Sequence, residues 1–244
     1  MLSAELDYYD RSCYCQVMNT TTTKKTSPLG DEPQPSKGQA SRATILLAAA
    51  KLATTKGLDG LSIGDLAAEV GMSKSGLYAH FKSKEELELA TIETAAAIFD
   101  GEVLQPAARA HAGTERLGAL VDAFLSHLER RVFPGGCFFA AVAAELDTRP
   151  GPARDRVVQV LDLWQSLLRQ CILDAQASGE IDPQAEVAQA AFEIQAMLLA
   201  GNYQFVLTND PVRLSQARKG VEHVLTRLAV QGESKKKRSA RGSP

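Results

Sequence analysis

The chain has 244 residues and a mass of 26.2 kDa, which excludes a peptide or a disulfide-stapled mini-protein and allows one large or two modest domains. Only 6% of the residues are aromatic whereas 36 are alanine, a bias that favours helices and argues against an all-β sandwich. The net charge is −2, no two cysteines form a C-x-x-C pair, and no stretch approaches 18 consecutive apolar residues. We therefore expect a cytoplasmic protein without a disulfide framework, metal, cofactor or membrane span.

Both ends of the chain are predicted to be disordered. Residues 1–40 are rich in threonine, proline, serine and glycine, a composition that cannot bury enough apolar surface to offset the entropy of ordering. Residues 233–244 carry a net charge of +4, and like charges repel one another where nothing apolar anchors them. Folded structure is therefore expected between residues 41 and 232.

Four helix starts are predicted between residues 41 and 90. A helical apolar period runs over about residues 41–55 and ends at Gly57. Ser62, Ser73 and Ser83 are each placed to cap a following helix, over about residues 63–70, 74–79 and 84–100. This pattern indicates a small helical domain over residues 41–90.

The helical period continues through residues 91–232. Further helices are expected at about residues 114–132, 138–147, 152–177, 184–208 and 212–230. The predicted fold class is all-α with about nine helices. It comprises an N-terminal three-helix domain and a larger helical domain.

The turn around Gly71 joins two short helices, which is the signature of a helix-turn-helix whose second helix enters the major groove of DNA. The groove is about 12 Å wide, so slim polar side chains are needed where that helix begins. The residues predicted to lie nearest the bases are Ser73, Lys74, Ser75 and Gly76. A glycine inside a helix costs about 1 kcal/mol relative to alanine, so Gly76 suggests that a base edge approaches the backbone closely.

The same segment carries a small positive face on a neutral domain. Lys74, Lys82 and Lys84 are the only charged residues from residue 72 to 84, and they are placed to neutralise DNA phosphates. Ser62 is expected to contact a phosphate as well. For the aromatic residues, Phe81 is expected in the core, whereas a packed ring with an exposed hydroxyl is expected for Tyr78.

Residues 71–87, GMSKSGLYAHFKSKEEL, closely resemble the signature of the TetR family of transcriptional regulators. The resemblance extends back over IGDLAAEV at residues 63–70, and the helix layout is similar to the family over about residues 41–230. It implies that Tyr78, His80 and Lys84 contact phosphates, and that the start of the third helix faces the bases. It also implies a homodimer and a ligand pocket in the C-terminal domain. The long N-terminal arm and the basic tail depart from the family pattern.

The predicted function is a ligand-responsive regulator that binds double-stranded DNA. We expect a repressor that binds a palindromic operator as a homodimer and is released by a small molecule. Small residues on the last two long helices allow two copies of this hairpin to approach closely. The predicted dimer interface consists of Ala190, Ile194, Met197, Leu198, Gly201, Val221 and Leu225.

A largely apolar effector is expected to bind among the central helices. The candidate pocket residues are the walls Phe124, Trp164 and Met197 and the polar anchors His127 and Asn202. At helical spacing, apolar residues more often pack in the core than bind a ligand, so core packing is the simpler interpretation of each of these residues. The helix that begins at Ser83 is the expected transmitter, because it runs from the phosphate-contacting lysines into the larger domain.

Two other classes of function receive weaker support. An enzyme would use Cys137 and His127 as nucleophile and base, but no orienting third group, phosphate loop or metal-spaced cluster accompanies them. A buried structural thiol is the simpler interpretation of Cys137, against a redox sensor or a covalent ligand site. An architectural protein that coats DNA through its basic tail is the second alternative, and it would bind many sequences with a strong dependence on salt.

Overall fold

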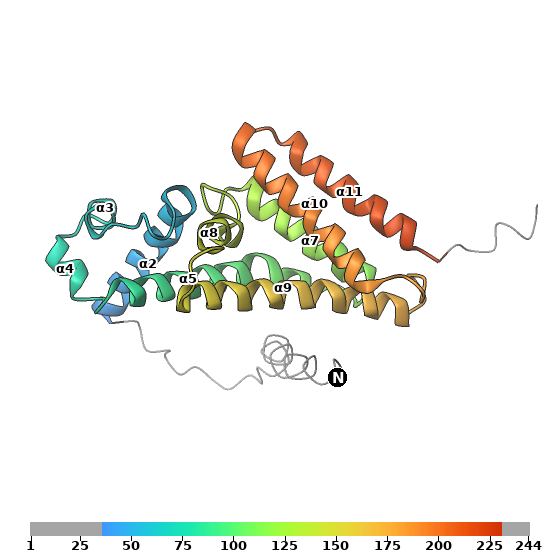
Figure 1. Ribbon diagram of the computed structural model, residues 1–244, viewed down its shortest axis with the longest axis horizontal. Helices are drawn as coiled ribbons and strands as arrows, with labels where there is room; N and C mark the ends of the chain where they lie inside the picture. Colours follow the sequence, from blue (N-terminus) through green and yellow to red (C-terminus); the bar gives the residue numbers. More distant parts are fainter. Residues whose placement is uncertain (1–35, 231–244) are drawn as a thin grey trace, which may run out of the picture. The chain divides into compact units, whose positions relative to one another are not determined.

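The computed structural model describes residues 36–230, and every described element is helical (Figure 1). The helices are α2 (Lys37–Lys56), α3 (Ile63–Glu69), α4 (Lys74–Tyr78), α5 (Lys84–Phe99), η1 (Asp100–Leu104), α6 (Gln105–Ala107), α7 (Thr114–Glu129), α8 (Phe138–Leu146), α9 (Pro152–Ala177), α10 (Val187–Thr208) and α11 (Val212–Leu228). Over this range the only β pairing is an isolated bridge between Ile181 and Ala229. Since α5, η1 and α6 form one continuous run, the all-α prediction with about nine helices is confirmed.

The chain divides into two compact units, residues 1–43 and residues 44–244. The described part of the first unit is the start of α2, where Ser36 and Gln39 exchange hydrogen bonds between side chain and backbone N–H. The helix therefore begins at Lys37, four residues before the predicted start at residue 41. The rest of the predicted N-terminal arm and the predicted basic tail lie outside the described residues.

The predicted serine caps are present in the three helices that follow α2. The hydroxyl oxygens of Ser62, Ser73 and Ser83 accept hydrogen bonds from the backbone N–H three residues later, at 3.0, 3.1 and 3.0 Å. Each cap satisfies one of the N–H groups that the first helical turn leaves without a partner. The turn between α3 and α4 passes through Gly71 at φ +66°, a left-handed conformation that glycine adopts without steric cost. Local sequence thus accounts for the helix-turn-helix.

The fourth helix is longer than predicted. Beyond the expected end near Asp100, the π-helical turn η1 and the short α6 carry it on to Ala107. Val103 and Ala107 are buried in this extension, so tertiary packing stabilises it. Pro106 lacks an N–H and could not complete an α-helical bond, and the wider π turn comes just before it.

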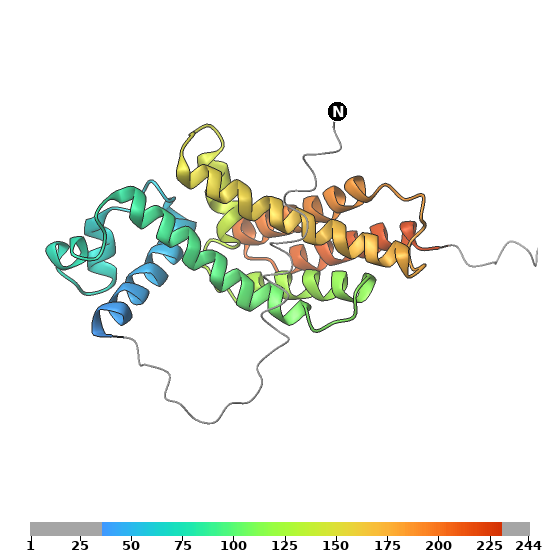
Figure 2. The same cartoon turned by 90° about the horizontal axis from the view of Figure 1, so that it is seen from below.

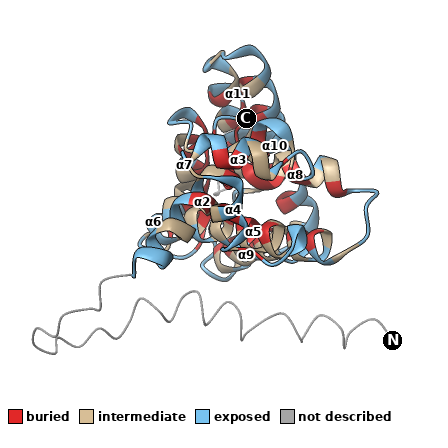
Figure 3. Ribbon diagram, turned by 90° about the vertical axis from the view of Figure 1, so that its left-hand side faces the viewer, coloured by how far each residue is buried: buried red, intermediate tan, exposed pale blue. Residues whose placement is uncertain are grey.

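Within the unit of residues 44–244, long helices pack side by side around one apolar core. α5 and α9 run alongside each other (Figure 2), and α10 packs against α11, α9 and α7. Figure 3 shows buried and exposed residues on opposite sides of the same helices, as the amphipathic pattern predicts. No helix of the described chain is both long enough and apolar enough to cross a bilayer.

The hairpin of α10 and α11 is closely packed inside one chain. A Cβ added to Gly201 would lie 2.6 Å from the Cβ of Ala217, so the two helices touch at this point. Five of the seven residues predicted for the dimer interface are buried in this chain, namely Ala190, Ile194, Leu198, Gly201 and Val221. The small residues therefore serve contacts within the chain, and only Met197 is exposed, with Leu225 half-buried.

Candidate DNA-binding surface and effector pocket

The residues predicted to face the bases lie together on α4 and its cap. Ser73, Lys74 and Ser75 are exposed, and Gly76 is half-buried. The Ser73 and Ser75 hydroxyls lie 3.1 Å apart, within hydrogen-bonding distance. Leu77, at 0% exposure, fixes the opposite side of the helix to the core. The arrangement presents polar groups on a short, anchored helix, which is the geometry that a reading helix needs.

The candidate phosphate contacts surround this helix. Tyr78 is 63% exposed and Phe81 only 3%, so the phenol faces solvent while the phenylalanine belongs to the core. Ser62, Tyr78 and Lys84 line one groove on the domain surface. Lys82 is exposed as well, and the His80 ring is half-buried with its centroid 6.4 Å from that of Phe81. That each of these residues contacts a base or a phosphate remains a prediction.

The Lys84 ammonium group has partners inside the chain. It donates to the backbone oxygen of Asp59 at 2.8 Å and to the carboxylate of Asp59 at 2.6 Å. The hydrogen bond and the positive charge of Lys84 hold the pKa of the Asp59 carboxyl below its usual value. The sequence analysis missed this pair, since the two residues are 25 positions apart in a loop and at a helix start.

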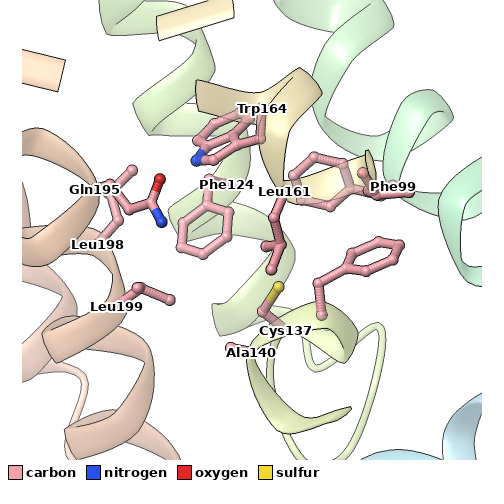
Figure 4. Close-up of a pocket in the computed structure, with 11 residues that line it drawn as sticks. Phe99, Phe124, Cys137, Ala140, Leu161, Trp164, Gln195, Leu198 and Leu199 are labelled. Atoms are coloured by element: carbon pink, nitrogen blue, oxygen red, sulfur yellow. The ribbon is translucent and has the colours of Figure 1, made fainter. Parts of the chain in front are cut away.

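A pocket that is partly open to solvent lies between α5, α7, α8, α9 and α10 (Figure 4). Its lining is apolar except for the Gln195 amide, the Cys137 thiol and the indole N–H of Trp164. The lining residues are Phe99, Phe124, Cys137, Phe139, Ala140, Val160, Leu161, Trp164, Gln195, Leu198 and Leu199. Phe99 is the centre of an aromatic cluster, with ring centroids 6.3 Å from Phe124, 6.1 Å from Phe139 and 5.6 Å from Trp164.

Of the five residues predicted for the pocket, Phe124 and Trp164 line it and the other three lie elsewhere. The Asn202 side-chain oxygen accepts a hydrogen bond from the backbone N–H of Cys137 at 2.9 Å, which holds the loop before α8. Met197 is on the surface of α10, where its sulfur would lie 2.8 Å from a Cβ added to Gly220. Most of the pocket residues that the sequence analysis missed follow the same helical period as the core, so the sequence does not separate them from core residues. Only Gln195, a polar residue between apolar ones, could have been recognised as a pocket residue.

His127 is buried just behind this pocket. Its ring is 1% exposed and makes edge contacts with Phe99 and Phe133, at centroid distances of 6.0 and 5.6 Å. Within the described part of the chain, neither ring nitrogen has a hydrogen-bond partner. Burial lowers the pKa of His127 to about 4, so the ring is neutral at pH 7.

The two described cysteines are buried thiols. Burial raises the pKa of the Cys137 thiol above its usual value, and it raises the pKa of Cys171 to about 11. Both are therefore protonated at neutral pH, whereas a nucleophile or metal ligand needs a thiolate. These properties fit a structural role for Cys137.

Comparison with known proteins identifies the family. Residues 45–91 match the family model for the bacterial regulatory proteins of the tetR family, and residues 113–221 match the model for the tetracyclin repressor-like C-terminal domain. A TetR transcriptional regulator from Chloroflexus aurantiacus is 30% identical, with a TM-score of 0.74 over 79% of this chain and 98% of its own. The chain belongs to the TetR family of transcriptional regulators.

More distant structures share the TetR fold. AibR, solved in complex with isovaleryl coenzyme A and operator DNA, is 23% identical, with a TM-score of 0.61 over 78% of this chain and 98% of its own. The ketosteroid regulator KstR2 of Mycobacterium tuberculosis is 17% identical, with a TM-score of 0.58 over 78% of this chain and 95% of its own. No curated protein matches the chain significantly. As a TetR-family member, the protein is a helix-turn-helix DNA-binding regulator of transcription.

Proposed function

We propose that this regulator is a repressor that binds a palindromic operator as a homodimer and leaves it when a small molecule binds. In this proposal residues 41–90 bind DNA, residues 91–232 bind the effector and the second protomer, and the protein works in the cytoplasm. The observation that carries the proposal is an apolar pocket in the same chain as an exposed helix-turn-helix. AibR, with coenzyme A ester and operator in one crystal structure, supports such a pairing of functions.

The surface available for a second protomer is the outer face of α10. Large apolar residues are exposed there at helical spacing, which a soluble monomer rarely leaves uncovered. They are Phe192, Leu199, Tyr203 and Leu207, with exposed fractions of 64, 39, 69 and 70%. We assign the dimer contact to this face rather than to the buried stripe. A two-fold pair would place two reading helices about 34–36 Å apart, one turn of DNA.

The effector proposed for the pocket is small and largely apolar. No lining residue carries a charge, so a buried ionic group on the ligand would lose its hydration without a counter-ion. Trp164, the only tryptophan in the chain, lines the pocket and reports occupancy through its fluorescence. Binding can shift the DNA equilibrium only by the difference in effector affinity between the two forms, about 1 to 3 kcal/mol in typical cases.

The test is selection of DNA sites from a random pool with the purified protein, followed by footprinting and sedimentation of the complex. Two protomers on a pseudo-palindrome with half-sites one turn apart are expected. Sequence-tolerant, strongly salt-dependent coating of DNA would instead favour the architectural alternative. A Tyr203→Glu variant should sediment as a monomer and lose tight site binding, whereas buried Ile194→Glu would unfold the chain and decide nothing.

A further inference from the structure

Lys84 is held in an ion pair at the edge of the DNA-facing groove. Its ammonium nitrogen lies 2.6 Å from the Asp59 carboxylate, and both side chains are about half exposed. Glu88 is the other acid nearby, and its carboxylate lies farther from the ammonium nitrogen, at 3.7 Å. The lysine that is proposed to bind a DNA phosphate is therefore already occupied by a carboxylate of the same domain.

Asp59 does not move freely, because residues near the end of α8 hold its loop. The two carboxylate oxygens of Glu145 accept hydrogen bonds from the backbone N–H groups of Leu58 and Asp59, each at 2.6 Å. Arg149 lies 3.3 Å from the Asp59 carboxylate and 3.5 Å from that of Glu145. A bidentate carboxylate on two consecutive N–H groups fixes both the position and the orientation of the loop.

The opposite end of α8 forms part of the effector pocket. Cys137 and Ala140, at its start, line the cavity (Figure 4), as does Phe139. Glu145 lies on the last turn of the same helix. A helix of nine residues is about 14 Å long, so α8 spans the distance between the cavity and the loop that carries Asp59. If α8 shifts as a unit, a displacement imposed at Ala140 would reach this loop.

We propose that Asp59 is an internal competitor of the DNA backbone for Lys84, and that Glu145 is the positioning residue that keeps this competitor in place. The inference rests on the proposed phosphate contact of Lys84. DNA binding exchanges the carboxylate for a phosphate, and the position of α8 sets how strongly the carboxylate competes. The protein therefore controls one phosphate contact per protomer from the effector side of the molecule.

The primary test is Asp59→Asn, measured on a site selected by the wild-type protein. The wild type and the variant make the same phosphate contact once bound, so the salt slope should stay the same. Because no ion pair has to be broken first, binding at fixed salt should tighten by about 1.5- to 5-fold per protomer, the range expected for an exposed ion pair. The matched control is Asp65→Asn, which removes the same charge from an exposed pair with Lys56 at 3.4 Å and should leave the affinity unchanged.

A double-mutant cycle separates this inference from the proposed function. Lys84→Ala alone should flatten the slope by about 0.9 per protomer, and Asp59→Asn should have no further effect in that background. An unchanged slope in Lys84→Ala would show that Lys84 does not contact a phosphate, and the proposed competition would then be wrong as well. If Lys84→Ala lowers the slope as expected but Asp59→Asn does not tighten DNA binding, the phosphate contact stands and the competition by Asp59 is wrong. The same conclusion follows if Asp65→Asn tightens DNA binding as much as Asp59→Asn does.

Two further variants test the part played by α8. Glu145→Gln keeps one acceptor oxygen, so hydrogen exchange at the Leu58 and Asp59 amides should accelerate and DNA binding should tighten only while Asp59 is present. Ala140→Phe places a ring in the cavity and imitates an occupant without a ligand. It should alter exchange at the same two amides. Unchanged exchange in both folded variants would show that α8 does not position the competitor.

Discussion

Replacing Gly135 by alanine should destabilise the protein through one backbone contact. A Cβ at this position would lie 1.9 Å from the carbonyl oxygen of Thr54 and 2.6 Å from its carbonyl carbon. The obstacle is helix backbone rather than a flexible side chain, and the neighbouring Ala50 and Ala53 are buried, so α2 cannot yield. The loop before α8 would have to move away from α2.

The size of the effect follows from two terms. Overpacking a well-packed contact costs about 1 to 3 kcal/mol. The displaced loop also loses the hydrogen bond from the Gly135 N–H to the Thr54 hydroxyl, which spans 3.0 Å and contributes about 1 kcal/mol. The free energy of unfolding should therefore fall by about 2 to 4 kcal/mol.

Urea unfolding at a fixed protomer concentration measures this change as a lower midpoint with an unchanged slope. Gly118→Ala in α7 is the matched control, because nothing lies within 4 Å of its added Cβ and the helix is continuous there. That variant should gain about 0.5 to 1 kcal/mol. Equal midpoints for Gly135→Ala and the wild type would refute the close approach of loop and helix.

Three further predictions concern DNA, pH and the pocket. Lys74→Ala should cost about 1 to 3 kcal/mol and relax the preference at one base pair if it reads a guanine; footprinting on variant sites checks this. Burial lowers the pKa of His127 to about 4 in the folded state, against 6.5 in the unfolded state. Below pH 6.5 the unfolded chain therefore binds a proton that the folded chain does not, and the free energy of unfolding should fall by up to about 3 kcal/mol as the pH drops from 6.5 to 4. His127→Phe should abolish that part of the urea-measured loss. Trp164 fluorescence should be quenched by an effector that displaces DNA, and Trp164→Phe should weaken effector binding.

Helix boundaries were predictable where the chain marks them locally. The predicted starts at residues 114, 138, 152 and 212 coincide with the observed ones, because a glycine or proline lies at the start of each of these helices or within the two residues before it. The serine caps were predictable for the same reason, since hydroxyl and N–H are three residues apart. The extension beyond Asp100 was not, because the packing of η1 and α6 against α7 sustains it.

The pocket and the dimer surface show what a periodic pattern leaves open. Trp164 and Leu168 lie one turn apart on α9, yet the first lines the cavity and the second is core at 0% exposure. Helical spacing identifies the inward face but not the places where packing leaves a gap. Likewise, small residues such as Gly201 indicate close helix approach without saying whether the partner helix belongs to the same chain or to a second copy.

Two helices connect the pocket to the same lysine, and their dimensions show that small movements suffice. α5 begins at Lys84 and ends at Phe99, a pocket residue about 22 Å away along the helix. A tilt of about 5° about Phe99 would shift Lys84 by about 2 Å, enough to break a contact of 2.6 Å to Asp59. Because α8 fixes Asp59 and α5 carries Lys84, we expect an occupant that moves either helix to change the proposed balance between carboxylate and phosphate. We therefore expect that the helix from Ser83 transmits the signal through its movement relative to α8, rather than alone. If α5 alone carried the signal, Glu145→Gln would have no effect on DNA binding.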